Sequence, residues 1–117
     1  MKVLRSLLFI PADSKKMLDK IDTLNPDAFI LDLEDSVPTS NKKNARDNII
    51  YKLEQISSEN KIKEIFIRVN DLDSSYIYED ISITISSKIS GYMIPKFESA
   101  NRVKKIISFI SQKEEDI

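Results

Sequence analysis

The sequence predicts an α/β fold with one parallel sheet, because four strand-like segments alternate with four helix-like segments along its 117 residues. The strand-like segments are short apolar runs, whereas the helix-like segments space their apolar residues three and four apart. Such a repeated β-α rhythm predicts a parallel sheet with right-handed crossovers. Two architectures fit: a small open doubly wound sheet, and half of a (β/α)8 barrel, which needs about 250 residues when complete.

The first unit begins with an apolar, β-rich run over residues 3–10, which Pro11 ends. Ser14 is a favourable N-cap for the helix that we expect over residues 15–23. Asn25-Pro26-Asp27 then indicates a turn. The apolar residues expected on one face of this helix are Met17, Leu18, Ile21 and Leu24.

The second unit has its strand over residues 28–33. Pro38-Thr39-Ser40 breaks the chain after this strand, and Ser40 or Asn41 can cap the helix that follows. We expect that helix to reach Ser57. Its buried face is expected to comprise Ala45, Ile49, Leu53 and Ile56.

The third unit has its strand over residues 64–69 and an ambiguous segment after it. Isoleucine alternates with serine or threonine over residues 81–86, which is typical of a half-buried strand. However, the place of residues 76–87 between the third and fourth strands favours a helix, and we predict a helix there.

The fourth strand is expected over residues 91–94, closed by Pro95, and Ser99 can cap a last helix over residues 100–111. We therefore expect residues 1–112 to form a partial barrel domain and residues 113–117 to form a charged tail at the truncation point. The face of this last helix that we expect to be buried comprises Val103, Ile106, Ile107 and Ile110.

The composition excludes several kinds of chemistry. The sequence has no cysteine and no histidine, so it has no thiolate nucleophile, Ser-His-Asp triad or His-ligated metal. With one glycine, Gly91, it also has no glycine-rich phosphate loop. A net charge of −1 gives no global attraction to nucleic acid or to a membrane. No apolar run reaches the roughly 18 residues of a membrane span, and no signal peptide is evident, so we expect a cytoplasmic location.

The most informative stretch is Leu31-Asp32-Leu33-Glu34-Asp35-Ser36-Val37, in which a buried strand runs directly into acidic residues. Carboxylates are costly to bury unless they are paired or bound to something. Parallel α/β folds build their active sites at the carboxyl ends of their strands. The stretch therefore indicates a polar site there, and the alternative is a solvated turn with a helix cap.

The other strands also end in polar residues, which parallel strands would bring to the same rim. Arg68 and Lys96 beside Glu34 and Asp35 would form a mixed-charge pocket. A guanidinium can bind a carboxylate through two hydrogen bonds, which suits a small organic acid. The alternative is that Arg68 simply pairs with Glu34 or Asp35 in a structural network.

Four motifs resemble those of the citrate lyase beta subunit and malyl-CoA lyase family, within the HpcH/HpaI aldolase superfamily. In chain order they are Arg5-Ser6-Leu7-Leu8-Phe9-Ile10-Pro11, Leu31-Asp32-Leu33-Glu34-Asp35-Ser36-Val37, Arg68-Val69-Asn70 and Pro95-Lys96-Phe97-Glu98-Ser99. The resemblance implies an α/β fold that is the N-terminal (βα)4 half of a (β/α)8 TIM-type barrel. It also implies a carbon–carbon lyase in which Mg2+ assists cleavage of a 3-hydroxyacyl thioester to an acyl thioester and a small keto or carboxylic acid.

The resemblance also implies roles for residues that could bind substrate. Arg68 matches the arginine that binds the substrate carboxylate and oxygen, and Phe9 lies near the acyl-CoA site. Lys16 and Lys20 lie where the malyl-CoA lyase branch has basic residues near the CoA. The thioester carrier is CoA or an acyl-carrier protein, and the motifs do not distinguish citryl-, malyl-, methylmalyl- and citramalyl-type substrates.

The acidic residues of the motifs have an implied place beside the metal. Glu34 and Asp35 match the acidic pair that borders the Mg2+ site and can hold metal-bound waters. Asn70, Lys96 and Glu98 belong to the matching rim motifs. The direct Mg2+ ligands of this family are a glutamate on the fifth strand and an aspartate on the sixth, so the resemblance implies no metal ligand in this chain.

Three hypotheses remain open for these 117 residues. The chain is a lyase presented as its N-terminal half, or it is a non-catalytic truncated remnant. The third hypothesis is a half-barrel that forms a homo-oligomer or pairs with the missing half as a second chain, because the outer edges of the first and fourth strands would be unpaired.

Overall fold

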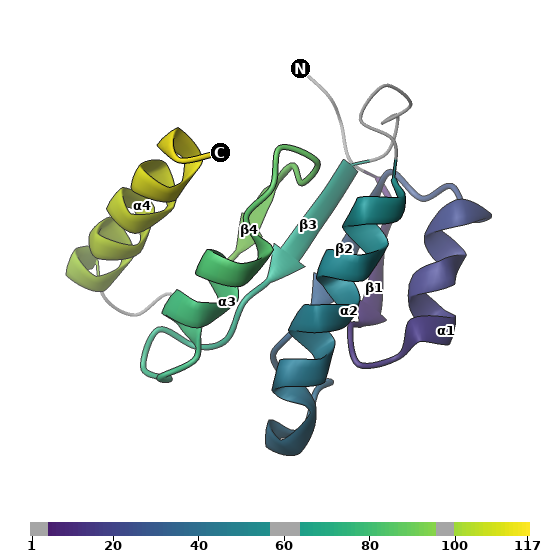
Figure 1. Ribbon diagram of the computed structural model, residues 1–117, viewed down its shortest axis with the longest axis horizontal. Coiled ribbons are helices and arrows are strands. Elements are labelled where there is room, and N and C mark those ends of the chain that lie inside the picture. Colours follow the sequence, from purple (N-terminus) through teal and green to yellow (C-terminus); the bar gives the residue numbers. More distant parts are fainter. Residues whose placement is uncertain (1–4, 57–63, 96–99) are drawn as a thin grey trace.

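The sheet is parallel throughout and follows the order of the sequence. A computed structural model describes residues 5–56, 64–95 and 100–117. Its four strands lie in the order β1-β2-β3-β4, and helices follow each of them (Figure 1). A doubly wound sheet reverses its strand order at a switch point, whereas a (β/α)8 barrel adds each strand beside the previous one. The topology is therefore that of a (βα)4 half-barrel.

The first unit is shorter and tighter than its sequence predicts. Strand β1 spans Leu7–Pro11, so residues 5 and 6 lie outside it, and residues 3 and 4 fall outside the described residues. Helix α1 covers only Lys15–Leu18 and tightens into the 3-10 helix η1, Asp19–Asp22. Ser14 caps α1 as predicted, because its Oγ accepts a hydrogen bond from the Met17 amide at 3.2 Å.

The second unit confirms the predicted strand and helix with small shifts of their ends. Strand β2 spans Ala28–Asp32, the short 3-10 helix η2 spans Thr39–Asn41, and helix α2 spans Lys42–Gln55. Residue 41 is the N-cap, but its side chain does not cap the helix. Its Nδ2 instead donates to Asp13 Oδ2 at 3.1 Å, which links the loops that follow β1 and β2.

The ambiguous segment of the third unit is a helix, as we predicted, and the fourth unit again has a strand followed by a helix. Strand β3 spans Glu64–Arg68, helix α3 spans Ile77–Thr84, strand β4 spans Gly91–Met93 and helix α4 spans Ala100–Glu115. Residues 113–115 thus continue the last helix rather than forming a tail. Ile107, expected on its buried face, is 54% exposed.

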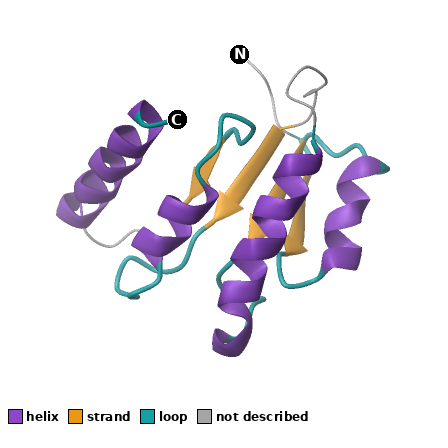
Figure 2. Cartoon of the chain, in the orientation of Figure 1, coloured by secondary structure: helices purple, strands orange, loops and turns teal. Residues whose placement is uncertain are grey.

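The apolar core lies between one face of the sheet and the helices (Figure 2). That sheet face carries Ile10, Phe29, Leu31, Ile65 and Ile67, and the helices contribute Leu18, Ile21, Ala45, Ile49, Leu53, Ile77, Ile81 and Ile106. None of the helices described is long and apolar enough to cross a bilayer. Side chains alternate between the two faces of a strand, so the residues between these core positions lie on the opposite face of the sheet. At the carboxyl end of that face, the parallel register places Asp32 beside Arg68.

Candidate functional site

The carboxyl ends of β2 and β3 are joined by an ion pair between their last residues. Arg68 Nε and Nη2 donate to the two carboxylate oxygens of Asp32, each at 2.8 Å. Asp32 is 2% exposed, and the Arg68 side chain is 21% exposed. Two parallel hydrogen bonds fix the plane of a guanidinium as well as its position. The register of β2 and β3 therefore places an oriented, partly exposed cation at the carboxyl ends of the strands.

The Asp32 carboxylate is fully engaged by its surroundings. Its Oδ1 also accepts from the Glu34 amide at 2.9 Å, and its Oδ2 accepts from the Ser36 amide at 3.0 Å and from Ser36 Oγ at 2.6 Å. Burial by itself would raise the pKa of Asp32, but the hydrogen bonds from Arg68, Ser36 and the two amides outweigh it and hold that pKa far below its usual range. The same pairing raises the pKa of Arg68.

Phe9 and Glu34 flank the Arg68 guanidinium. The ring centroid of Phe9 lies 5.2 Å from Arg68 Cζ, a cation–π distance. Glu34 Oε1 lies 3.9 Å from Arg68 Nε, and Glu34 is buried whereas Asp35 is exposed. The sequence suggested Glu34 or Asp35 as the partner of Arg68. That expectation was wrong for the main contact, because Asp32 takes both hydrogen bonds.

The loop after β2 wraps around the ammonium group of Lys42. Lys42 Nζ donates to the carbonyl oxygens of Leu33, Glu34 and Val37 at 3.0, 3.2 and 3.1 Å. Three donors are all that an ammonium group has, so the buried charge is fully hydrogen-bonded. The loop that carries Glu34 and Asp35 is therefore shaped by a side chain from the first turn of α2.

The loop after β3 is held in a comparable way by the buried carboxylate of Asp80, which is 0% exposed. Asp80 Oδ2 accepts from the backbone amide and from Nδ2 of Asn70 at 2.9 and 2.7 Å. Asp80 Oδ1 accepts from Arg46 Nε at 2.7 Å. Asn70, which the sequence placed on the rim, thus has its side-chain amide turned to Asp80.

Not all of the predicted site residues come together. Lys16 and Lys20 are exposed on α1 and η1, and their role near a CoA group stays a prediction. Lys96 and Glu98 lie outside the described residues, so their place on the rim also stays a prediction.

The described residues do not by themselves fit a resident Mg2+. Mg2+ needs several oxygen ligands in near-octahedral geometry. Within residues 5–56, 64–95 and 100–117, no group of three acidic side chains is placed to hold a metal ion. The Asp32 oxygens already accept five hydrogen bonds. Glu34 and Asp35 are the next acids in the loop that follows Asp32.

Sequence reasoning assigned no role to Asp32, Lys42 or Asp80, although each organises the site. Aligning the ends of β2 and β3 would have paired Asp32 with Arg68, because each is the last residue of its strand. Lys42 and Arg46, at the start of the second long helix, fit the pattern of the family that the motifs resemble, but Asp80 gave no comparable signal. A charged residue on an amphipathic helix is usually solvated, and the burial of Lys42 and Asp80 depends on contacts between elements.

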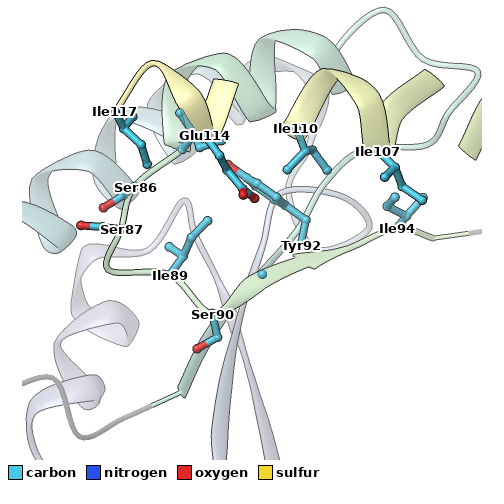
Figure 3. Close-up of a pocket in the computed structure, with 12 residues that line it drawn as sticks. Ser86, Ser87, Ile89, Ser90, Tyr92, Ile94, Ile107, Ile110, Glu114 and Ile117 are labelled. Atoms are coloured by element: carbon cyan, nitrogen blue, oxygen red, sulfur yellow. The ribbon is translucent and has the colours of Figure 1, made fainter. Parts of the chain in front are cut away.

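A separate cavity lies along β4 and α4. Its volume is about 550 Å3, and Figure 3 shows Ile89, Tyr92, Ile107, Ile110, Glu114 and Ile117 among the side chains that line it. Burial raises the pKa of Tyr92 to about 12, with a further contribution from the charges of Asp80 and Glu114. The lining mixes isoleucines with serines and Glu114, and it includes none of the residues around Arg68. We therefore place the candidate site at the ends of β2 and β3.

Comparison with known proteins gives matches over nearly the whole chain. The profile of the HpcH/HpaI aldolase/citrate lyase family matches residues 5–117. A (3S)-malyl-CoA thioesterase of Cereibacter sphaeroides is 35% identical over 106 residues, which cover 91% of this chain and 36% of that protein. The mitochondrial citramalyl-CoA lyase of Homo sapiens is 34% identical over 102 residues, which cover 86% of this chain and 29% of that protein.

A solved structure shows the same arrangement. The protein CitE from Mycobacterium tuberculosis, in complex with magnesium, acetoacetate and coenzyme A, matches with a TM-score of 0.68 and 25% identity. The match covers 91% of this chain and 38% of CitE. The chain therefore spans between about a quarter and two fifths of the length of these three proteins. The resemblance based on the four motifs is confirmed.

Proposed function

Because this chain belongs to the HpcH/HpaI aldolase/citrate lyase family, we propose that it is the N-terminal part of a carbon–carbon lyase site. The substrate would be a 3-hydroxyacyl thioester, cleaved to an acyl thioester and a small keto or carboxylic acid. The relatives named for malyl-CoA and citramalyl-CoA, and the neighbour that holds acetoacetate and coenzyme A, support this substrate class.

The observation that carries the proposal is the state of the Arg68 guanidinium. A guanidinium has five N–H donors in a fixed plane. Asp32 binds the edge of the guanidinium formed by Nε and Nη2, and Nη1 makes no hydrogen bond to any of the described residues. The Nη1–Nη2 edge can therefore bind a second carboxylate through two hydrogen bonds while Asp32 holds the first edge still. The ring centroid of Phe9 lies 5.2 Å from Arg68 Cζ, a cation–π distance that further limits where the guanidinium can lie.

Glu34 and Asp35 would border a Mg2+ ion whose direct ligands come from outside the described residues. When bound, such an ion acts as a Lewis acid on the oxygen of a keto acid. The part of this chain is to orient the acid through Arg68 and to keep negative charge at the rim through Glu34. Lys16 and Lys20 would lie towards the thioester carrier.

A binding titration tests this proposal. Acetoacetate added to the purified chain, with and without Mg2+, should shift the NMR signal of the Arg68 side chain. Arg68→Lys keeps the positive charge but loses the planar guanidinium that can form two parallel hydrogen bonds, so it should weaken acetoacetate binding about tenfold or more. Arg102→Lys is the matched control, because Arg102 is an exposed arginine of α4 that pairs with Asp73. Equal binding by both variants would contradict the role of Arg68.

The open sheet supports a second candidate, a half-barrel that is active only with further strands. Among the described residues β1 pairs only with β2 and β4 pairs only with β3, and unpaired edges tend to associate. These strands could come from a second copy or from a polypeptide equivalent to the remainder of the relatives. Mixing the chain with the C-terminal remainder of the citramalyl-CoA lyase of Homo sapiens should then produce lyase activity that neither part has alone. Turnover by the chain alone while it is a monomer in sizing chromatography would refute this requirement.

A further inference from the structure

We propose that Lys42, Arg46, Asp80 and Tyr76 form a positioning unit that sets the distance between the two rim loops and so aims Arg68 at its substrate. The inference rests on the proposed function in one respect only, namely that Arg68 binds the substrate acid. These residues are not placed to touch substrate. They act through two loops: the one after β2, which carries Glu34, and the one after β3, which directly follows Arg68.

Both loops are anchored to the first two turns of one helix. Lys42 holds three carbonyl groups of the loop after β2. Arg46 holds Asp80, which in turn holds the backbone amide and the side chain of Asn70, two residues after Arg68. Lys42 and Arg46 are one helical turn apart and so lie on the same face of α2. The rigid spacing of that turn therefore sets the spacing of the loops.

Tyr76 joins the two anchors. Its ring centroid lies 5.7 Å from Lys42 Nζ and 5.8 Å from Arg46 Cζ, so one aromatic ring lies within cation–π distance of both cations. Tyr76 directly precedes α3, the helix that carries Asp80. The ring, the carboxylate and the two cations thus form one contiguous cluster behind the rim.

Stability by itself does not explain this cluster, because burying its charges costs free energy. Two cations one turn apart repel each other, and both are buried. Arg46 Nη2 is buried without a hydrogen-bond partner among the described residues. Apolar residues of similar volume often replace buried ion pairs without loss of stability. What apolar residues cannot do is hold three carbonyl groups and one backbone amide in fixed directions, and this is the contribution that we assign to the cluster.

The site gains a defined geometry from this arrangement. The Leu33 amide donates to the Arg68 carbonyl oxygen at 2.9 Å, so the two loops start from adjoining points of the sheet. Beyond that point the cluster holds the far side of both loops, while Asp32 holds the Glu34 and Ser36 amides from the sheet side. A shift of either loop would move Glu34 relative to the guanidinium, which lies 3.9 Å away.

Hydrogen exchange at the Arg68 Nε proton tests the inference directly, since this proton donates to Asp32. Lys42→Met and Asp80→Asn should each accelerate that exchange about tenfold or more, the scale on which outer partners of functional groups act. Lys52→Met is the matched control. Lys52 is an equally buried lysine of α2, but it pairs with Asp19 and Asp22 of η1. It should leave Arg68 exchange within about twofold of the original.

A milder pair of variants keeps the test decisive if the charge changes prevent folding. Tyr76→Leu removes the shared ring and should accelerate Arg68 exchange, whereas Tyr76→Phe keeps the ring and should leave the original rate. A purely structural role predicts instead that all variants, Lys52→Met included, change the exchange in proportion to their loss of overall stability. That result, or no change in any of them, would overturn the inference.

Acetoacetate binding separates this inference from the proposed function. If the original chain binds acetoacetate, Lys42→Met and Asp80→Asn should weaken binding while Lys52→Met does not. If the original chain fails to bind it, the proposed function is contradicted, whereas the exchange of the Arg68 proton still decides whether the cluster positions Arg68.

Discussion

The β2–β3 end of the sheet and the β4–α4 side of the molecule are held in place by different interactions. At the β2–β3 end, buried charges meet in defined pairs: Asp32 with Arg68, and Asp80 with Arg46. Along β4 and α4, Tyr92 and several isoleucines line a cavity of about 550 Å3, with serines and Glu114 among them. Charge pairs specify directions, whereas apolar contacts supply area without direction. We therefore expect the groups that must be held in fixed directions to lie at the β2–β3 end of the sheet.

The largest expected effect is the loss of the arginine from the buried pair. Arg68→Met leaves the carboxylate of Asp32 buried without its cation, which should lower the free energy of unfolding by about 3–5 kcal/mol. Arg102→Met breaks the exposed ion pair with Asp73 on the α4 side and should cost less than about 1 kcal/mol. Urea denaturation measures both, and equal losses would remove the contrast between the two regions.

A second comparison concerns packing on α3 and α4. Ile81 of α3 is fully buried, so Ile81→Ala should lower the free energy of unfolding by about 2–4 kcal/mol. Ile110 of α4 is only partly buried beside the cavity, so Ile110→Ala should cost about 1 kcal/mol. Thermal denaturation followed by circular dichroism measures the difference. A larger loss at Ile110 would mean that α4 is packed as tightly as α3.

The same contrast explains how much of the molecule its sequence predicts. The four units follow from apolar periodicity, which is a local signal, so the strands and helices lie near their expected places. Ile107 was misplaced because its burial depends on what packs outside α4. Arg68 and Glu34 were located at the rim, but Asp32 as the partner of Arg68 follows only from the strand register. Lys42 and Asp80 are buried by contacts between elements, which no single segment encodes.

The pH dependence of stability should separate the two regions. The pKa of Asp32 is lowered on folding, so its contribution is present above the unfolded pKa near 3.8 and is lost as the pH falls below it. The pKa of Tyr92 is raised from 10.0 to about 12, so its contribution is present below pH 10 and is lost between pH 10 and 12. The alkaline loss should be at most about 3 kcal/mol.

Two substitutions test whether the acid and alkaline losses of stability come from Asp32 and Tyr92. Asp32→Asn should flatten the acid limb of stability against pH and leave the alkaline limb unchanged, and Tyr92→Phe should do the reverse. Urea denaturation at a series of pH values between 2 and 12 measures both limbs. If Tyr92→Phe leaves the alkaline limb as steep as before, that limb does not report on the β4–α4 side.

The smallest expected effect is a gain of stability at the start of β4. A Cβ atom at Gly91 would lie 3.4 and 3.5 Å from Cε1 and Cδ1 of the Phe66 ring, which is ordinary contact. Gly91→Ala should raise the free energy of unfolding by about 0.5 kcal/mol, because alanine has fewer unfolded conformations to lose. Gly91→Val, whose extra methyl groups would meet the same ring, is the paired variant and should be less stable than Gly91→Ala. If alanine instead destabilises the protein, Phe66 has no room to adjust, and β4 is as tightly constrained as the end of the sheet that carries Arg68.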